Sequence, residues 1–202
     1  MKAMLKLLGD TAPGMGVALA DNHKSYKLYP DQLVDLCVAH GAVVEQEDLE
    51  YRINKGYITT WYVCCADVFP NVFTFSPPAE GAFIGWYSTA AGFDGFLRWA
   101  YCSWVNEPLL DSRFRAWPAG DTYVVYPDAR SSIRFERLVE GIRDAEKIRI
   151  LREKLEKEGT PESGEKLDRL NEVVAKFNIT EDPGNLLALM ISGKQMLEEL
   201  SR

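Results

Sequence analysis

Short apolar runs alternate with polar, turn-rich stretches over the first 128 residues, and the remainder shows helical spacing of its apolar positions. The segment GMGVALAD (14–21) is an apolar run bounded by Gly and Asp, which is typical of a buried strand. The segment YITTWYVCC (57–65) is rich in residues that favour strands. Between them, LVDLCVA (33–39) fits either a helix or a buried strand.

Helices are expected between these strands. The segment 45–56 starts acidic, ends basic and stops at a glycine, which matches the dipole preferences of a short helix. The segment 77–92 opens with two prolines and predicts a second helix, and 95–104 predicts the next strand. This order indicates parallel βαβ units, and the apolar strands favour a sheet covered on both faces or closed into a barrel. Four strands would form about half of an eight-stranded (βα) barrel.

The region after residue 130 predicts helices only. Segments 131–159, 163–178 and 183–202 have helical spacing, and Gly159 marks the end of the first of them. We therefore expect an α/β fold in which 1–130 is the C-terminal half of a (β/α)8 TIM-type barrel, with about four parallel strands. The helical segment 131–202 is expected to pack on that partial barrel.

Charge and composition exclude several classes of protein. The net charge of −7 and the isoelectric point near 5.0, without a basic stripe, argue against nucleic acid as a partner. No apolar stretch is long enough to cross a bilayer, and the apolar run before Asp10 is too short for a signal peptide. The four cysteines lack metal-ligand spacing, and no Gly-rich phosphate loop is present. We expect neither a metal nor a cofactor.

The run GFLRWAYCSW (95–104) is the first candidate site. It places Arg98 and Ser103 among Trp99, Tyr101 and Trp104, where a core strand would carry Val, Ile and Leu. Flat aromatic rings beside a few hydrogen-bonding groups suit a sugar, which has apolar C–H faces and a hydroxyl edge. The alternative is an aromatic-rich core strand with an incidental arginine.

A second candidate follows the strand predicted at 57–65. Trp61, Tyr62 and Asn71 lie at and just beyond its end, where the loops of a barrel build binding sites. Tyr62 and Asn71 offer hydrogen bonds to a substrate, and Trp61 offers a ring on which it can stack. The alternative is a buried aromatic cluster beneath a Pro-rich loop.

Acidic and histidine residues give weaker signals. Glu45, Glu47, Asp48 and Glu50 follow the second apolar run, and an acidic helix N-terminus is the favoured interpretation. His23 and His40 belong to no recognisable nucleophile or metal motif, so Ser–His or Cys–His catalysis is not expected.

Several unusual motifs occur in order between Trp61 and Leu151: WYVCC with PNVF, AAGFDGFLRWAYCSW, RFRAWPAGDTYVVYP and SSIRFERLVEGIRDAEKIRIL. Together they resemble the C-terminal region of bacterial glycoside hydrolases catalogued as domain of unknown function 4091, which includes the barrel end of family 123, the N-acetyl-β-galactosaminidases. The resemblance implies a retaining mechanism in which the N-acetyl oxygen of the substrate attacks the anomeric carbon. It also implies an adjacent Asp-Glu pair, in which Asp orients the acetamide and Glu protonates the leaving oxygen.

This sequence contains no Asp-Glu dipeptide, and Glu47-Asp48 has the reverse order. We therefore expect a part of such an enzyme that supplies sugar contacts from Trp61, Tyr62, Asn71, Arg98 and Trp104 and no catalytic residue. The resemblance implies a periplasmic or secreted parent protein. An open half barrel also exposes sheet edges, which predicts a homodimer, pairing with the missing N-terminal half, or covering helices. The alternatives are a non-catalytic carbohydrate-binding or scaffold module, and an unrelated hydrolase that uses the cluster near Glu45.

Overall fold

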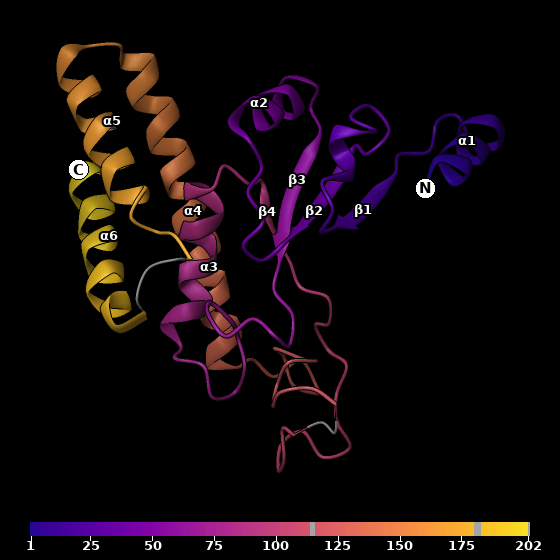
Figure 1. Cartoon of the computed structure of the whole chain (residues 1–202). Coiled ribbons are helices and arrows are strands. Elements are labelled where there is room, and N and C mark those ends of the chain that lie inside the picture. Colours follow the sequence, from indigo (N-terminus) through magenta and orange to yellow (C-terminus); the bar gives the residue numbers. More distant parts are fainter. Residues whose placement is uncertain (114–115, 180–182, 202) are drawn as a thin grey trace. The chain divides into compact units, whose positions relative to one another are not determined.

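The computed structural model describes residues 1–113, 116–179 and 183–201, and it divides into two compact units, Met1–Tyr62 and Val63–Arg202. The first unit contains α1 (Lys2–Thr11), β1 (Ala18–Asp21), a 3-10 turn (Ser25–Lys27), β2 (Asp35–Ala39), α2 (Gln46–Asn54) and β3 (Ile58–Tyr62). β1, β2 and β3 lie side by side and pair in parallel (Figure 1). The strands predicted at 14–21 and 57–65 are thus confirmed with shorter bounds, and the last five residues of LVDLCVA form the strand β2.

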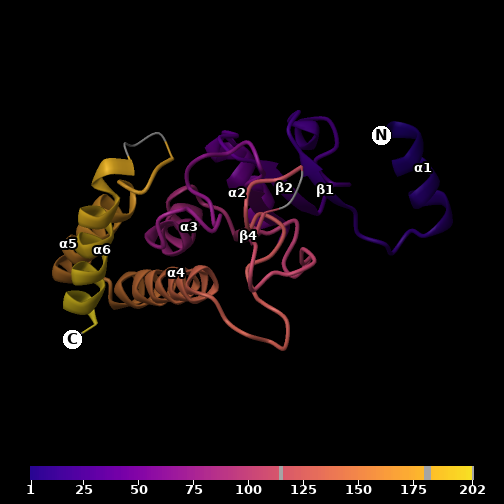
Figure 2. The same ribbon diagram turned by 90° about the horizontal axis from the view of Figure 1, so that it is seen from below.

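The core of the first unit lies around β2. Leu36, Val38 and Trp61 are buried, together with Leu49 on the inner side of α2. The helix predicted at 45–56 is confirmed as α2, with Glu47 and Asp48 in its first turn. In contrast, α1 has no buried residue, and Figure 2 shows it clear of the sheet.

A buried arginine ties together the chain at the amino ends of β2 and β3. The guanidinium of Arg52 donates to the Leu33 carbonyl at 2.8 Å, to the Ile58 carbonyl at 2.6 Å and to Thr59 Oγ1 at 2.7 Å. These bonds satisfy backbone groups at the points where the strands begin, since buried carbonyl groups need partners.

The second unit contains α3 (Ala79–Ala90), β4 (Gly95–Leu97), α4 (Ile133–Glu158), α5 (Pro161–Val174), a 3-10 turn (Pro183–Asn185) and α6 (Leu186–Leu200). The Ser132 side chain caps the start of α4 by accepting from the Phe135 N–H, and Gly159 ends the helix with a φ of 61°. Three helices, α4, α5 and α6, follow residue 130 in the described part of the chain. The strand predicted at 95–104 is limited to three residues.

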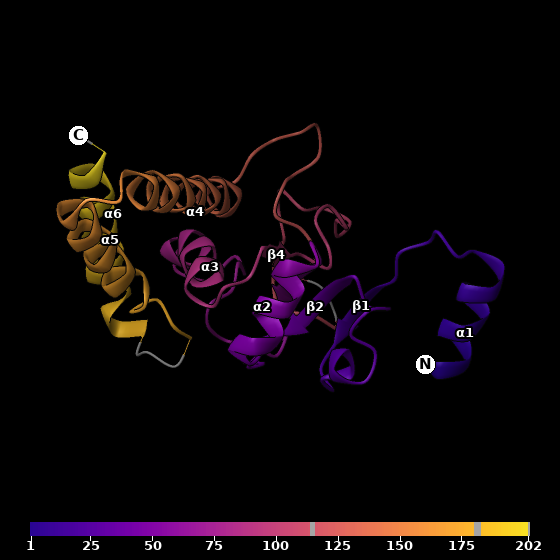
Figure 3. The same cartoon turned by 90° about the horizontal axis from the view of Figure 1, so that it is seen from above.

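Helices α3 and α4 pack closely, as Figure 3 shows. The contact depends on Gly85 and Gly141: a Cβ atom on Gly85 would lie 2.1 Å from the Gly141 carbonyl oxygen, and one on Gly141 would lie 2.4 Å from the Ala82 oxygen. On the other side of α3, Trp86 stacks on Phe177 with 4.3 Å between ring centroids. Packing between α3 and α4 joins segments on both sides of residue 130 within the second unit.

Candidate functional site

The carboxyl ends of β1, β2 and β3 form one edge of the sheet in the first unit. The parallel register pairs Asp21 with Val38 and Val38 with Trp61, and one step further it pairs Ala39 with Tyr62. Ligands of parallel α/β sheets bind outside this edge. The residues that end these strands or follow them are therefore the first place to look for a site.

Trp61 does not offer its ring to a ligand in this structure. Its side chain is 0% exposed, and its ring lies 6.4 Å from that of His40, measured between centroids. The burial pattern of β3 places Trp61 on the covered face and leaves Tyr62 half-buried. The expected stacking role of Trp61 is therefore replaced by a packing role, while Tyr62 keeps exposed surface.

Asp21 holds the turn that follows β1. Its carboxylate accepts from the His23 N–H at 2.9 Å and from the Ser25 N–H at 2.5 Å, and the Ser25 hydroxyl lies 3.2 Å from it. A carboxylate that satisfies two backbone donors after a strand forms a local turn. Asp21 is thus engaged in shaping the loop.

The acidic cluster near Glu45 is the start of α2. Glu45 pairs with Lys24 at 3.2 Å and Asp48 pairs with Lys27 at 2.9 Å, whereas Glu47 is exposed in the first turn. Acidic side chains stabilise a helix N-terminus by interacting with its dipole. The geometry agrees with the helix-start interpretation.

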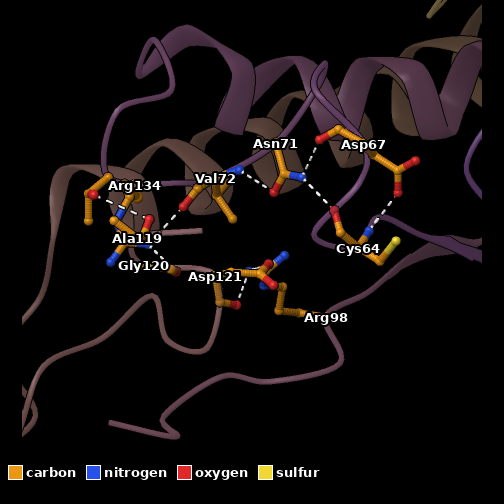
Figure 4. Close-up of polar contacts among 10 residues, drawn as sticks. Cys64, Asp67, Asn71, Val72, Arg98, Ala119, Gly120, Asp121 and Arg134 are labelled. Atoms are coloured by element: carbon orange, nitrogen blue, oxygen red, sulfur yellow. Dashed lines mark hydrogen bonds and ion pairs between the residues drawn. The ribbon is translucent and has the colours of Figure 1, made fainter. Parts of the chain in front are cut away.

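The side-chain amide of Asn71, in the second unit, forms hydrogen bonds within the protein through both its nitrogen and its oxygen (Figure 4). Its Nδ2 donates to the carbonyl oxygens of Cys64 at 3.1 Å and Asp67 at 2.7 Å, and its Oδ1 accepts from the Val72 N–H at 2.8 Å. The residue is fully buried, and its backbone N–H donates to Glu80 at 2.7 Å. Asn71 shapes the loop after Val63, and its amide has no donor left for a substrate.

Arg98 is also engaged within the fold. It pairs with Asp121 at 2.8 Å and donates to the Asp121 carbonyl, with side chains that are 7% and 0% exposed (Figure 4). Arg134 joins the same loop by donating to the carbonyls of Val72 at 2.7 Å and Gly120 at 2.8 Å. These contacts brace the segment around Gly120, and they place the Arg98 guanidinium away from solvent.

Glu80 is a buried acid that the sequence pattern did not single out. Burial raises the pKa of its carboxyl to about 7, and the hydrogen bond from the Asn71 N–H acts in the opposite direction. In the sequence, an acidic residue just after two prolines is typical of any helix start, and Glu80 does lie in the first turn of α3. Only the fold shows that this particular helix start is buried.

Trp104 keeps an exposed ring in a fixed orientation. Its Nε1–H donates to the Val125 carbonyl at 2.8 Å, and 44% of the residue is exposed. Trp99, Tyr101 and Trp117 in the same region are exposed to a similar degree. Trp99 and Trp117 pack edge to face, with 5.6 Å between their ring centroids. A partly exposed indole that is held by its N–H is suited to an amphipathic ligand such as a sugar.

In 1–113, 116–179 and 183–201, no group of three His, Cys, Asp or Glu side chains is arranged to hold a metal ion. Every helix in those ranges falls short of the length or hydrophobicity that a bilayer crossing demands. A cavity of about 360 Å³ lies between α3, α4 and α6 and is lined by Ala82, Met190 and Ile191 among others, but no predicted site residue lines it.

Known proteins resemble the chain in fold and in family. A family 123 glycoside hydrolase from Clostridium perfringens, studied for the details of glycolipid glycan hydrolysis, matches 99% of this chain with a TM-score of 0.79 and 24% identity. This chain covers 38% of that enzyme's chain. No protein of curated function matches. The family model described as glycoside hydrolase 123, catalytic domain, matches residues 1–151, and the chain therefore belongs to glycoside hydrolase family 123.

Proposed function

We propose that this chain is the C-terminal part of a glycoside hydrolase that acts on N-acetylhexosamine-containing glycans. In this proposal it contributes sugar-binding residues and lacks the catalytic Asp-Glu pair. The family match over residues 1–151 carries the proposal. The absence of any Asp-Glu dipeptide from the sequence supports its second part. The more specific resemblance, to domain of unknown function 4091, remains a prediction.

The proposed architecture is half of a (β/α)8 barrel followed by helices. The parallel pairing of β1, β2 and β3 supports it. The match to the Clostridium perfringens enzyme also supports it, because it extends over 99% of this chain but only 38% of that enzyme's chain. In a barrel the remaining strands would come from another part of the protein. The acid that protonates the leaving oxygen would belong to that part.

Trp104 is the proposed main sugar contact. Its ring is held by one hydrogen bond and remains partly exposed, so little conformational entropy is lost when a sugar stacks on it. Tyr62 is proposed as a hydrogen-bonding residue at the carboxyl edge of β3. Trp61, Asn71 and Arg98 are buried, and in this proposal each supports the part of its own unit in which it lies.

The catalytic part of the proposal is tested with an aryl N-acetyl-β-galactosaminide. We expect the 202-residue chain to release no aryl alcohol above background, because the acid is absent. The Glu47→Gln variant serves as the internal comparison, since Glu47 is an exposed acid of the predicted cluster. Turnover that disappears in Glu47→Gln would refute the claim that the chain lacks its own acid.

The binding part is tested by calorimetry with N-acetylgalactosamine and N-acetylglucosamine. Removing a stacking indole costs about 1–3 kcal/mol, so Trp104→Ala should weaken binding by roughly tenfold or more. Leu110→Ala is the matched control, because it removes an exposed apolar side chain from the same region. Equal binding by wild type and Trp104→Ala would contradict the assignment of Trp104.

The second candidate is a non-catalytic carbohydrate-binding or scaffold module derived from such an enzyme. The exposed rings around Trp104 in a chain without the Asp-Glu pair favour it. Sugar binding with Trp104 dependence, combined with no turnover after addition of the missing half, would favour the binding module. Absence of binding to any glycan would favour the scaffold. Glu45 and Asp48 are held in ion pairs, which disfavours the alternative of an unrelated hydrolase that uses the acidic cluster near Glu45.

The proposed partner is either a second copy or the N-terminal half of the same enzyme. β1 is one of the two edge strands of the described sheet, and α1 leaves Met4 and Leu7 exposed. Unpaired strand edges and apolar helix faces recruit partners. Light scattering of the isolated chain distinguishes the two: a dimer supports the first, and a clean monomer excludes it. A periplasmic or secreted parent remains part of the proposal.

A further inference from the structure

The cavity among α3, α4 and α6 lies within the second unit, and none of the residues proposed for sugar binding lines it. Its volume of about 360 Å³ falls in the range of pockets that hold small ligands. Much of its wall is apolar, with Ala82 from α3 and Met190 and Ile191 from α6. Its charged groups are Arg137 and Glu140 from α4 and Lys194 from α6.

The packing of α6 on α3 explains why this space is left between the helices. Gly193 lets α6 approach Trp86 of α3 closely, since a Cβ atom on Gly193 would lie 2.7 Å from the indole. About one turn earlier on the two helices stand Ala82 and Met190, and both line the cavity. Alanine fills little volume, and the unbranched side chain of methionine adapts to what lies beside it.

Apolar surface on α6 remains in water beside the cavity. Leu187 and Ile191 line the cavity and are nevertheless 66% and 49% exposed, whereas Met190 is 5% exposed. An aliphatic chain that packs against them removes apolar surface from water, which is favourable in proportion to the area covered. The wall therefore favours a ligand with an aliphatic body.

The one carboxylate of the cavity wall has no oxygen left for a ligand. Glu140 Oε1 pairs with Lys194 at 2.6 Å, and Glu140 Oε2 accepts from Arg137. Burial acts to raise the pKa of Glu140, but the hydrogen bonds from Lys194 and Arg137 outweigh it and hold the pKa below its ordinary value of 4.5. Lys194 is occupied as well, because Asp144 also pairs with it at 2.7 Å.

Arg137 retains hydrogen-bond donors. Within the described residues its guanidinium is bonded through Nη1 to Glu140, and 41% of its side chain is exposed. A guanidinium has five N–H donors in a planar fork and no acceptor. The polar part of a ligand must therefore accept hydrogen bonds, and a carboxylate matches the fork with two parallel bonds.

We propose that this cavity binds a free aliphatic monocarboxylate. The aliphatic chain packs against Ala82, Met190 and Ile191, and the carboxylate accepts hydrogen bonds from Arg137. A cationic amphiphile is disfavoured, because both oxygens of Glu140 are already engaged. The inference does not depend on the proposed function and adds a ligand of a different chemical class.

The test uses octanoate as the probe and NMR of the methionine methyl groups in the wild-type chain as the readout. Met190→Leu assigns the Met190 signal among the five methionines. We expect this signal to shift and saturate, because Met190 is buried in the cavity wall. Octanol, which has the same chain without the charge, should bind about tenfold more weakly, since charge-assisted hydrogen bonds are lost.

Arg137→Met should weaken octanoate binding about tenfold and leave the affinity for octanol unchanged, because it removes the guanidinium and keeps an apolar stem. Arg149→Met is the matched control: it removes another arginine of α4, which pairs with Glu146 outside the cavity, and should leave both affinities unchanged.

An unmoved Met190 signal over the whole octanoate titration would overturn the inference, and this result does not depend on how any variant folds. Equal affinities for octanoate and octanol, or equal octanoate affinities of the wild type and Arg137→Met, would overturn the carboxylate contact. So would a loss in Arg149→Met as large as that in Arg137→Met. The proposed function is judged separately, by sugar binding in Trp104→Ala.

Discussion

The guanidinium of Arg98 and the carboxylate of Asp121 form an ion pair at 2.8 Å that is almost entirely removed from solvent. The two residues are 23 positions apart, and the pair connects the end of β4 to the loop after Pro118. Burial opposes the charged form of Arg98 and lowers its pKa, while Asp121 acts to raise it. The pair is therefore a buried charge whose cost is offset only while its partner is present.

Loss of Asp121 should be among the most destabilising single changes in the second unit. Asp121→Ala leaves a buried guanidinium without its counter-ion and should lower the free energy of unfolding by about 3–5 kcal/mol. Urea denaturation measures the change. Glu199→Ala, which breaks the exposed pair with Arg169, is the control and should cost less than about 1 kcal/mol. Equal losses in the two variants would contradict this assignment.

The double variant Arg98→Met with Asp121→Leu sharpens the same prediction. It removes both charges and keeps much of the buried volume, so most of the stability lost in Asp121→Ala should return. A double variant as unstable as Asp121→Ala would show that the cost comes from the loop geometry and not from the unpaired charge.

Glu80 should make stability fall as pH rises. Its pKa is about 7 in the folded chain against 4.5 for an ordinary glutamate, because burial disfavours the charged form. The folded state therefore holds the proton more tightly between pH 4.5 and pH 7, and stability is lost as the pH climbs through that window. Between pH 5 and pH 8 the loss from this group should reach about 2–3 kcal/mol.

Comparison of wild type with Glu80→Gln isolates the effect. Both proteins share every other titrating group, so the difference between their unfolding free energies reports Glu80 alone. We expect the free energy of unfolding of Glu80→Gln, relative to that of the wild type, to rise by about 2–3 kcal/mol as the pH is raised from 5 to 8. A difference that stays constant across this range would show that Glu80 titrates at its ordinary pKa.

The close approach of α3 and α4 should not tolerate a methyl group. Gly85→Ala and Gly141→Ala each place a Cβ atom closer than 2.5 Å to a backbone oxygen of the opposite helix, so the helices must separate. We expect each change to cost about 3 kcal/mol in thermal or urea denaturation. Gly164→Ala in α5, which meets nothing within 4 Å, is the control and should stabilise by about 0.5–1 kcal/mol.

Arg52 should be essential for the stability of the first unit. Arg52→Met leaves the carbonyls of Leu33 and Ile58 without this donor and should cost about 3 kcal/mol, with faster hydrogen exchange in β2 and β3. Arg149→Met, at an exposed position on α4, should change stability by less than about 1 kcal/mol. Unchanged exchange in both strands would exclude this role of Arg52.

The succession of strands and helices was largely predictable from the sequence, because period and turn chemistry are local properties. β1, β3, α2, α3 and the helical C-terminal region all occur where the pattern placed them. The run 95–104 was the main difference. Its β-forming composition predicted one strand, but β4 ends at Leu97, where Arg98 turns to pair with Asp121. A contact across 23 residues is invisible to local propensity.

The sequence by itself determined that the chain is an α/β protein with a helical end, that it carries an unusual aromatic run, and that it has no Asp-Glu dipeptide. Only the tertiary structure decided which of those residues face solvent. Trp61, Asn71 and Arg98 are held inside, whereas Trp104 keeps a partly exposed ring. The reason is physical: burial depends on neighbours far apart in the chain, as when Arg134 bonds Val72 across 62 residues, and no local pattern encodes such neighbours.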